Sequence, residues 1–293
     1  MIYEAFISAV FFFLKTAPLI LFLYLIIWYI YQKNYMLKIL DRLNSIAKLM
    51  KLNPIAFTSF TLSFVSIIAS YTFLSQAWRD RSVKDREVIG ISLLNSFPST
   101  FNHLYTFYIP FVIPLLGYVG FIYTLIRIGV ALIKTIVGYF LIEKSSKFKS
   151  EEIDSKLNIE LAENVGKILI ILFLSYFAIE LMYEVGVFEF IVEQTKFLPI
   201  HPSALTISLV AIFNMRSAVV ITAGFIEKGL NYKWALAGLI LGNVISFSVR
   251  FARHSLPLHL SLFGRLGFKI VLVNSIMTLA LDFLVLVIIV ITL

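Results

Sequence analysis

The chain has 293 residues, of which 60% are hydrophobic and only 14% charged, with a formal net charge of +8 at pH 7. A soluble domain has about 25% charged residues, so this composition excludes an ordinary soluble protein and predicts an all-α, polytopic helical membrane protein. The chain contains no cysteine, which excludes disulfides and thiol chemistry, and we attribute the excess of Lys and Arg to cytoplasmic loops rather than to nucleic-acid binding.

The first half of the chain contains five predicted elements. Residues 5–31 form an apolar run that is too long for a signal peptide and predicts a spanning helix. Residues 36–51 place apolar residues at helical spacing and charged residues at the positions between them, which predicts an amphipathic helix in the membrane interface. A second spanning helix is predicted over residues 54–78. Residues 88–103 are apolar but short and are interrupted by Asn, Ser and Gly, which predicts a re-entrant or broken segment. Residues 121–142 form the last spanning helix.

The second half repeats this order. The stretch PFVIPLLGYVGF at residues 110–121 and the stretch PLHLSLFGRLGF at residues 257–268 place Pro, Gly, Gly and Phe at the same internal spacing. Asn95 likewise matches Asn243. Ordered matches of this kind predict a duplication into residues 1–146 and 147–293. The predicted joints before the last spanning helix of each copy are Pro110, Gly117, Gly120, Pro257, Gly264 and Gly267.

Topology follows from the number of crossings in each copy. The second copy has predicted spanning helices at residues 165–183, 202–226 and 269–293 and a broken segment at residues 235–251. Three crossings per copy make the two copies inverted repeats, whereas full crossing by the short segments would make them parallel. With the N-terminus outside, the basic groups at residues 33–51, 144–167, 228–233 and 250–269 lie inside and those at residues 79–86 and 196 lie outside.

The motif VKDREVIGISLLNSFPSTF at residues 83–101, followed by the Pro…Gly…Gly loop, resembles the Gate or nucleoside-recognition domain. This domain occurs in concentrative nucleoside transporters, bacterial ferrous-iron transporters and spore maturation membrane proteins. The stretch NMRSAVVITAGFIEKGLNYKWALAGLILGN at residues 214–243 is similar to a second copy. The resemblance implies either transport of a small solute or assembly with partner proteins.

Polar residues inside the apolar runs are the candidate site. Arg216 lies near the middle of one predicted spanning helix and Asp282 near the middle of another, so they either form a buried ion pair or place Arg216 in a cavity between the repeats. Arg127 and Lys134 are further intramembrane cations, which favours an anionic ligand.

Amides suit a polar ligand because they both donate and accept hydrogen bonds, although Asn95 and Asn243 would also serve as contacts between helices. Ser66 and Ser70 match Asn214 and Ala218 and are further candidates for the same cavity. Arg250 belongs to the sequence RFARH, which suits either a phosphate or the membrane surface. The predicted substrate-binding residues are Asn95, Ser96, Asn214, Arg216, Ser217, Asn243, Ser246 and Arg250.

The sequence contains no catalytic motif, so we expect no enzyme activity, no cofactor and no metal site. The function predicted is a multi-pass cell-membrane transporter or permease for a small polar, anionic or nucleoside-like solute bound between the repeats. The alternative is a non-transporting membrane component that assembles with partner proteins. An intramembrane enzyme acting on a lipid phosphate is a weaker third alternative. The partners expected are the lipid bilayer and the solute, with a coupling ion and a second copy of the chain as further candidates, and no nucleic acid.

Overall fold

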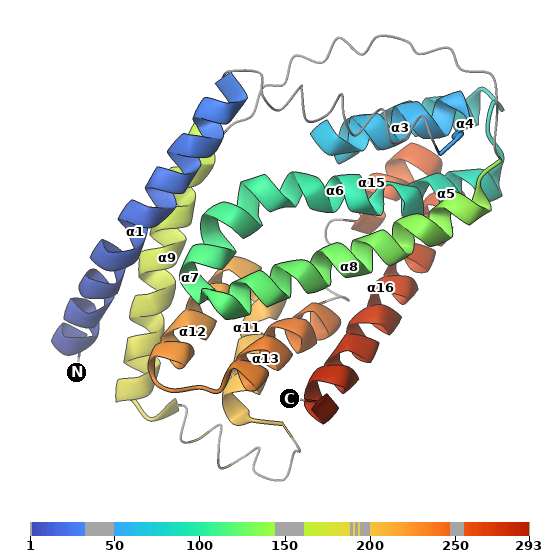
Figure 1. Ribbon diagram of the computed structural model, residues 1–293. Helices are drawn as coiled ribbons and strands as arrows, with labels where there is room; N and C mark the ends of the chain where they lie inside the picture. The colour runs from blue at the N-terminus through green and yellow to red at the C-terminus, as the bar shows by residue number, and fades with distance from the viewer. Residues whose placement is uncertain are drawn as a thin grey trace.

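The computed structural model describes residues 2–32, 50–143, 161–187, 190, 193, 200–246 and 255–292. Most of these residues are helical and none belongs to a β-strand, which confirms an all-α fold. Four helices are long and apolar enough to cross a membrane. They are α1 (Ile2–Gln32), α8 (Tyr118–Leu141), α9 (Leu161–Glu184) and α16 (Arg265–Thr292) (Figure 1).

Helices α1 and α9 lie side by side and run in opposite directions along one flank of the molecule (Figure 1). Aromatic rings hold the pair together, with Phe12 stacked on Tyr176 at 3.8 Å between ring centroids and Phe6 edge-on to Phe173. Large apolar side chains such as Phe11 and Phe22 point away from the pair and are exposed. An exposed apolar surface of this kind suits contact with lipid tails.

The segment predicted as a spanning helix over residues 54–78 is instead a helical hairpin. It consists of α3 (Pro54–Val65) and α4 (Ile67–Arg79), separated by Ser66 in an extended conformation. The hydroxyl groups of Ser59 and Ser70 are 2.8 Å apart, whereas residues 11 positions apart on a straight helix are separated by about 16 Å. The two helices therefore fold back on each other, and the prediction of one spanning helix is wrong.

The segment predicted over residues 202–226 breaks at the matching position. It forms α11 (Pro202–Phe213) and α12 (Met215–Glu227), separated by Asn214. Ser66 has φ −151° and ψ 114°, and Asn214 has φ −156° and ψ 117°. The side chain of each accepts a hydrogen bond from the backbone N–H three residues later, as an N-cap residue does. This second spanning helix was therefore also predicted wrongly.

The segment after the first hairpin is broken, as predicted, but it does not turn back. It consists of α5 (Asp85–Leu94), α6 (Ser96–His103), the π-helix η1 (Leu104–Val112) and α7 (Ile113–Leu116). At its start, Lys84 Nζ lies 2.9 Å from the Glu143 carboxylate just beyond the end of α8, and this hydrogen bond raises the pKa of Lys84 and lowers the pKa of Glu143. The segment therefore runs antiparallel along α8.

The matching segment of the second half is described in part. Helix α13 (Tyr232–Ile245) is continuous and packs against α11 and α16, and α15 (Leu256–Phe263) leads into α16. The rest of the predicted broken segment at residues 247–251 lies outside the described residues, as do Arg250 and nearly all of the predicted amphipathic helix at residues 36–51.

The glycines predicted as joints have the same geometry in both halves. Gly117 and Gly264 both have φ 54°, with ψ −124° and −132°, a conformation that side chains disfavour. A Cβ on Gly120 would lie 2.6 Å from the carbonyl oxygen of Val112, and one on Gly267 would lie 2.1 Å from that of His259. Of the two joint prolines, Pro110 lies within η1 and Pro257 in the first turn of α15.

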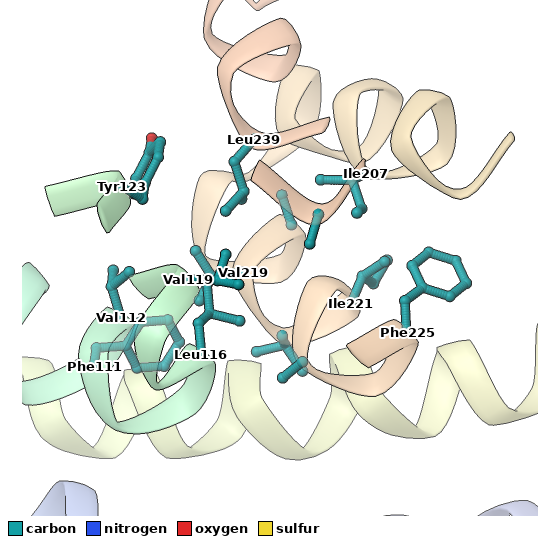
Figure 2. Close-up of a cluster of buried hydrophobic side chains, with 14 of the residues drawn as sticks. Phe111, Val112, Leu116, Val119, Tyr123, Ile207, Val219, Ile221, Phe225 and Leu239 are labelled. Carbon is teal, nitrogen blue, oxygen red and sulfur yellow. The ribbon is translucent and has the colours of Figure 1, made fainter. Parts of the chain in front are cut away.

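An apolar core joins the two halves of the chain. Val112, Leu116 and Val119 from η1, α7 and α8 face residues of α11–α13 in the second half, among them Val219 and Leu239 (Figure 2). Close apolar packing of this kind fixes the two halves against each other. It also means that a polar site between the halves has to lie elsewhere.

Candidate functional site

A polar cavity of about 190 Å³ lies where α4, α5, α6, α8 and α16 meet. Most of its lining comes from the first half of the chain, and two residues come from α16 in the second half. No acidic side chain belongs to the lining described. The polar lining residues are Tyr71, Ser92, Asn95, Ser96, Ser99, Thr100, Arg127, Lys134, Asn274 and Thr278.

The helix break between α5 and α6 lies beside this cavity, whose lining includes Asn95 and Ser96. Pro98 has no N–H with which to bond the carbonyl of Leu94, four residues earlier. The hydroxyl of Thr135 on α8 takes over this role, donating to the Leu94 carbonyl at 3.0 Å and accepting from the N–H of Phe97 at 3.0 Å. The break is therefore stabilised by a side chain from another helix.

Asn95 occupies the break and is fully buried. Its side-chain nitrogen donates to the hydroxyls of Ser59 and Ser70, at 2.9 and 3.0 Å, across the α3–α4 hairpin. Its side-chain oxygen has no hydrogen-bond partner among the described residues. An unpaired buried polar atom costs about 1–3 kcal/mol, so this enclosed oxygen is a cost that the fold carries at the wall of the cavity.

The cations of the cavity come from one face of α8. Arg127 forms an ion pair of 2.6 Å with Asp282 of α16, and Lys134 donates to Thr278 of the same helix at 3.0 Å. Asp282 is 1% exposed, so this pair is shielded from solvent. The predicted pairing of Asp282 with Arg216 is wrong because α16 packs against α8, which places Arg127 opposite Asp282.

The other predicted site residues that the structure describes do not line this cavity. Asn214 caps α12 and is exposed, and Arg216 lies two residues later, in the first turn of that helix. The Ser217 hydroxyl accepts a hydrogen bond from the Ser175 hydroxyl at 3.0 Å. Asn243 is buried and donates to the Tyr123 hydroxyl at 2.9 Å. Ser246 is the buried C-cap of α13. Among the described residues of the predicted binding set, only Asn95 and Ser96 lie together in the cavity.

Sequence reasoning missed the contribution of α16. Asn274 donates to the Ser92 hydroxyl at 2.8 Å and lines the cavity together with Thr278. Asn274 occupies the position in the second half that Arg127 occupies in the first, counted from the joint glycines. This polar pair at matching positions of two spanning helices was a signal that could have identified the residue.

Replacing Thr135 by Val should destabilise the break without altering the cavity lining. The loss of its hydroxyl leaves two buried backbone groups without a partner, so we expect the free energy of unfolding to fall by about 1–3 kcal/mol. Denaturant unfolding in detergent measures the change. The control is Thr124→Val on the same helix, because the Thr124 hydroxyl bonds only the Gly120 carbonyl of its own turn. Equal losses in the two variants would contradict a special role for Thr135.

Comparison with known proteins gives three relatives and no assigned activity. No protein-family model matches the chain, and no solved structure matches it. Uncharacterized protein MJ0871 of Methanocaldococcus jannaschii is 38% identical over 289 residues, which cover 92% of this chain and 90% of that protein. Uncharacterized proteins MJ0880 and MJ1556 of the same organism are each 22% identical, over 72% and 74% of this chain and 76% and 75% of their own lengths. The extent of the first match shows that the chain belongs to the same family as uncharacterized protein MJ0871.

Proposed function

We propose that the protein is a permease that moves a small polar solute across the cell membrane through the polar cavity. The observation that carries the proposal is the cavity itself, which combines a helix break, an unsatisfied amide oxygen on Asn95 and residues from both halves of the chain. Broken helices are costly in lipid unless their free backbone groups line a cavity or meet protein. Transporters place such breaks at the solute site.

The architecture supports two copies of inverted orientation. Helices α1 and α9 occupy matching places in the two halves and run antiparallel (Figure 1). The breaks at Ser66 and Asn214 share their dihedral angles, as do the joints at Gly117 and Gly264. Inverted repeats allow a central site to open to either side by exchange of the two conformations. The resemblance to the Gate domain points to the same class of protein.

The hairpins correct the side assigned to several basic residues. The Arg79 guanidinium donates to the Leu262 carbonyl at 3.2 Å, and Arg79, Arg265 and Lys269 line one groove. They therefore lie on one side of the membrane, whereas the charge assignment had put residues 79–86 opposite residues 265–269. Lys233 donates to the Val290 carbonyl at the far end of α16, so it lies on the other side. The first correction adds the basic residues at 79–86 to the side assigned as inside, whereas the second moves Lys233 to the side assigned as outside. The larger share of cations still lies on the inside, which supports an N-terminus outside.

Single cysteines test the permease, since the natural chain has none. Ser99→Cys places a thiol in the cavity lining, and Ser63→Cys places one in the fully buried part of α3 as the control. In proteoliposomes we expect a membrane-impermeant maleimide to label position 99 from either side in turn, and position 63 from neither. Labelling from one side only would favour the assembly component over the permease, and no labelling at position 99 would contradict an accessible cavity.

A further inference from the structure

The cavity carries positive charge that none of the described carboxylates balances. The charge of Arg127 is matched by Asp282 at 2.6 Å. Lys134, two turns further along α8, donates to the Thr278 hydroxyl, and none of the described carboxylates forms an ion pair with it. An ammonium group held among packed membrane helices without a counter-ion is costly. This cost is removed if an anion enters the cavity.

The remaining lining is rich in hydrogen-bond donors. Ser96, Ser99 and Thr100, which are among the first five residues of α6, contribute hydroxyls to the lining, and Thr278 contributes another from α16. Ile67, the first residue of the 13-residue helix α4, also lines the cavity. The N-terminus of a helix carries a partial positive charge that attracts anions. Hydroxyls, an ammonium group and a helix N-terminus together suit a group with several oxygen atoms and a negative charge.

The size of the cavity favours a small ligand. Pockets that hold drug-sized molecules are about 300–1,000 Å³, whereas this cavity is about 190 Å³. We infer that the cavity binds a small oxyanion, carrying a phosphate or carboxylate group, with Lys134 as its counter-ion. This inference rests on the proposed permease because it names the class of solute. It departs from a neutral nucleoside, which would leave the charge of Lys134 unbalanced.

Thermal unfolding of the purified full-length chain in detergent tests the inference. The probes are inorganic phosphate, sulfate and succinate, with potassium chloride at equal ionic strength and adenosine as the comparison solutes. We expect at least one oxyanion to raise the Tm above its chloride control, because a ligand of the native state stabilises it. Comparing the Tm shift with phosphate to the shift with succinate shows whether the cavity prefers a phosphate or a carboxylate group. No shift with any oxyanion would overturn the inference.

The decisive variant is Lys134→Met. We expect it to raise the Tm of the empty protein, because an unbalanced charge is replaced by an apolar chain of similar length. We also expect it to weaken oxyanion binding about 10- to 100-fold, the usual effect of losing a charged hydrogen bond. A lysine with a purely structural role would instead lower the Tm when replaced. The control is Lys84→Met, which removes an exposed lysine outside the cavity and should leave oxyanion binding unchanged.

Two further measurements keep the outcomes separate. If Lys134→Met does not fold, Thr278→Val removes the hydroxyl that orients the ammonium group while keeping the charge, and it should weaken binding several-fold; unchanged binding would contradict the proposed geometry. Counterflow of the bound anion in proteoliposomes tests the permease itself. Oxyanion binding without flux would reject the permease and keep the oxyanion site. Flux of adenosine without oxyanion binding would keep the permease and reject the oxyanion site.

Discussion

Replacing Asp282 by Leu is expected to destabilise the protein by about 3–5 kcal/mol, because it leaves Arg127 charged and unpaired between two packed helices. The pair is 2.6 Å long, and its side chains are 17% and 1% exposed. The double variant Arg127→Met/Asp282→Leu should recover most of this loss, since both charges are then removed. Denaturant unfolding of the single and double variants in detergent gives the coupling energy directly.

The matched control for this pair is the ion pair of Lys84 and Glu143, which has the same kind of contact but is largely exposed. Exposed ion pairs contribute little because water screens them. We therefore expect Glu143→Gln to leave stability unchanged within error. A small loss in Asp282→Leu, or a double variant as unstable as the single one, would show that Arg127 and Asp282 do not depend on each other.

Replacing Gly138 by Ala is the second change with a large expected effect. A Cβ at this position would lie 2.4 Å from the Leu94 backbone nitrogen and 2.5 Å from the Gly90 carbonyl oxygen. Neither backbone atom can move without separating α5 from α8 beside the break at Asn95. Overpacking of this kind costs about 1–3 kcal/mol, and the displaced break should also close or distort the cavity.

Gly129→Ala on the same helix provides the control for this substitution. No atom lies within 4 Å of a Cβ built there, so only the helix preference for Ala over Gly should act, which stabilises by about 0.5–1 kcal/mol. The two variants should therefore shift the Tm in opposite directions. A rise in Tm for Gly138→Ala would show that α5 and α8 are further apart than the structure places them.

Local sequence patterns were sufficient where the physical cause is local. The four long apolar helices follow from runs of hydrophobic residues, because transfer into lipid depends on composition over one continuous stretch. The joints followed from glycine itself, since Gly117 and Gly264 adopt a positive φ that other residues avoid. The broken segment around Asn95 followed from its short length and interrupting polar residues.

Composition failed at the two helical hairpins. Residues 54–78 and 202–226 are long and apolar enough to span, so counting hydrophobic residues predicted two straight helices. Each break depends on one extended residue, Ser66 or Asn214, whose side chain caps the next helix. In the first hairpin a residue of another helix also stabilises the break. The break leaves the carbonyls of Phe64 and Val65 without helical partners, and the Asn102 side-chain amide of α6 donates to both. Neither contact leaves a signal in mean hydropathy.

The sequence by itself determined that the protein is an all-α membrane protein whose polar and glycine positions recur in two halves, because hydropathy and backbone preference act over neighbouring residues. Only the tertiary structure decided that Arg127 rather than Arg216 pairs with Asp282, that Asn95 meets Ser59 and Ser70, and that Lys134 has no carboxylate partner among the described residues. The physical reason is that partners are chosen by which helix faces come together. That choice depends on packing between separate segments, which lie 155 residues apart in the sequence for Arg127 and Asp282.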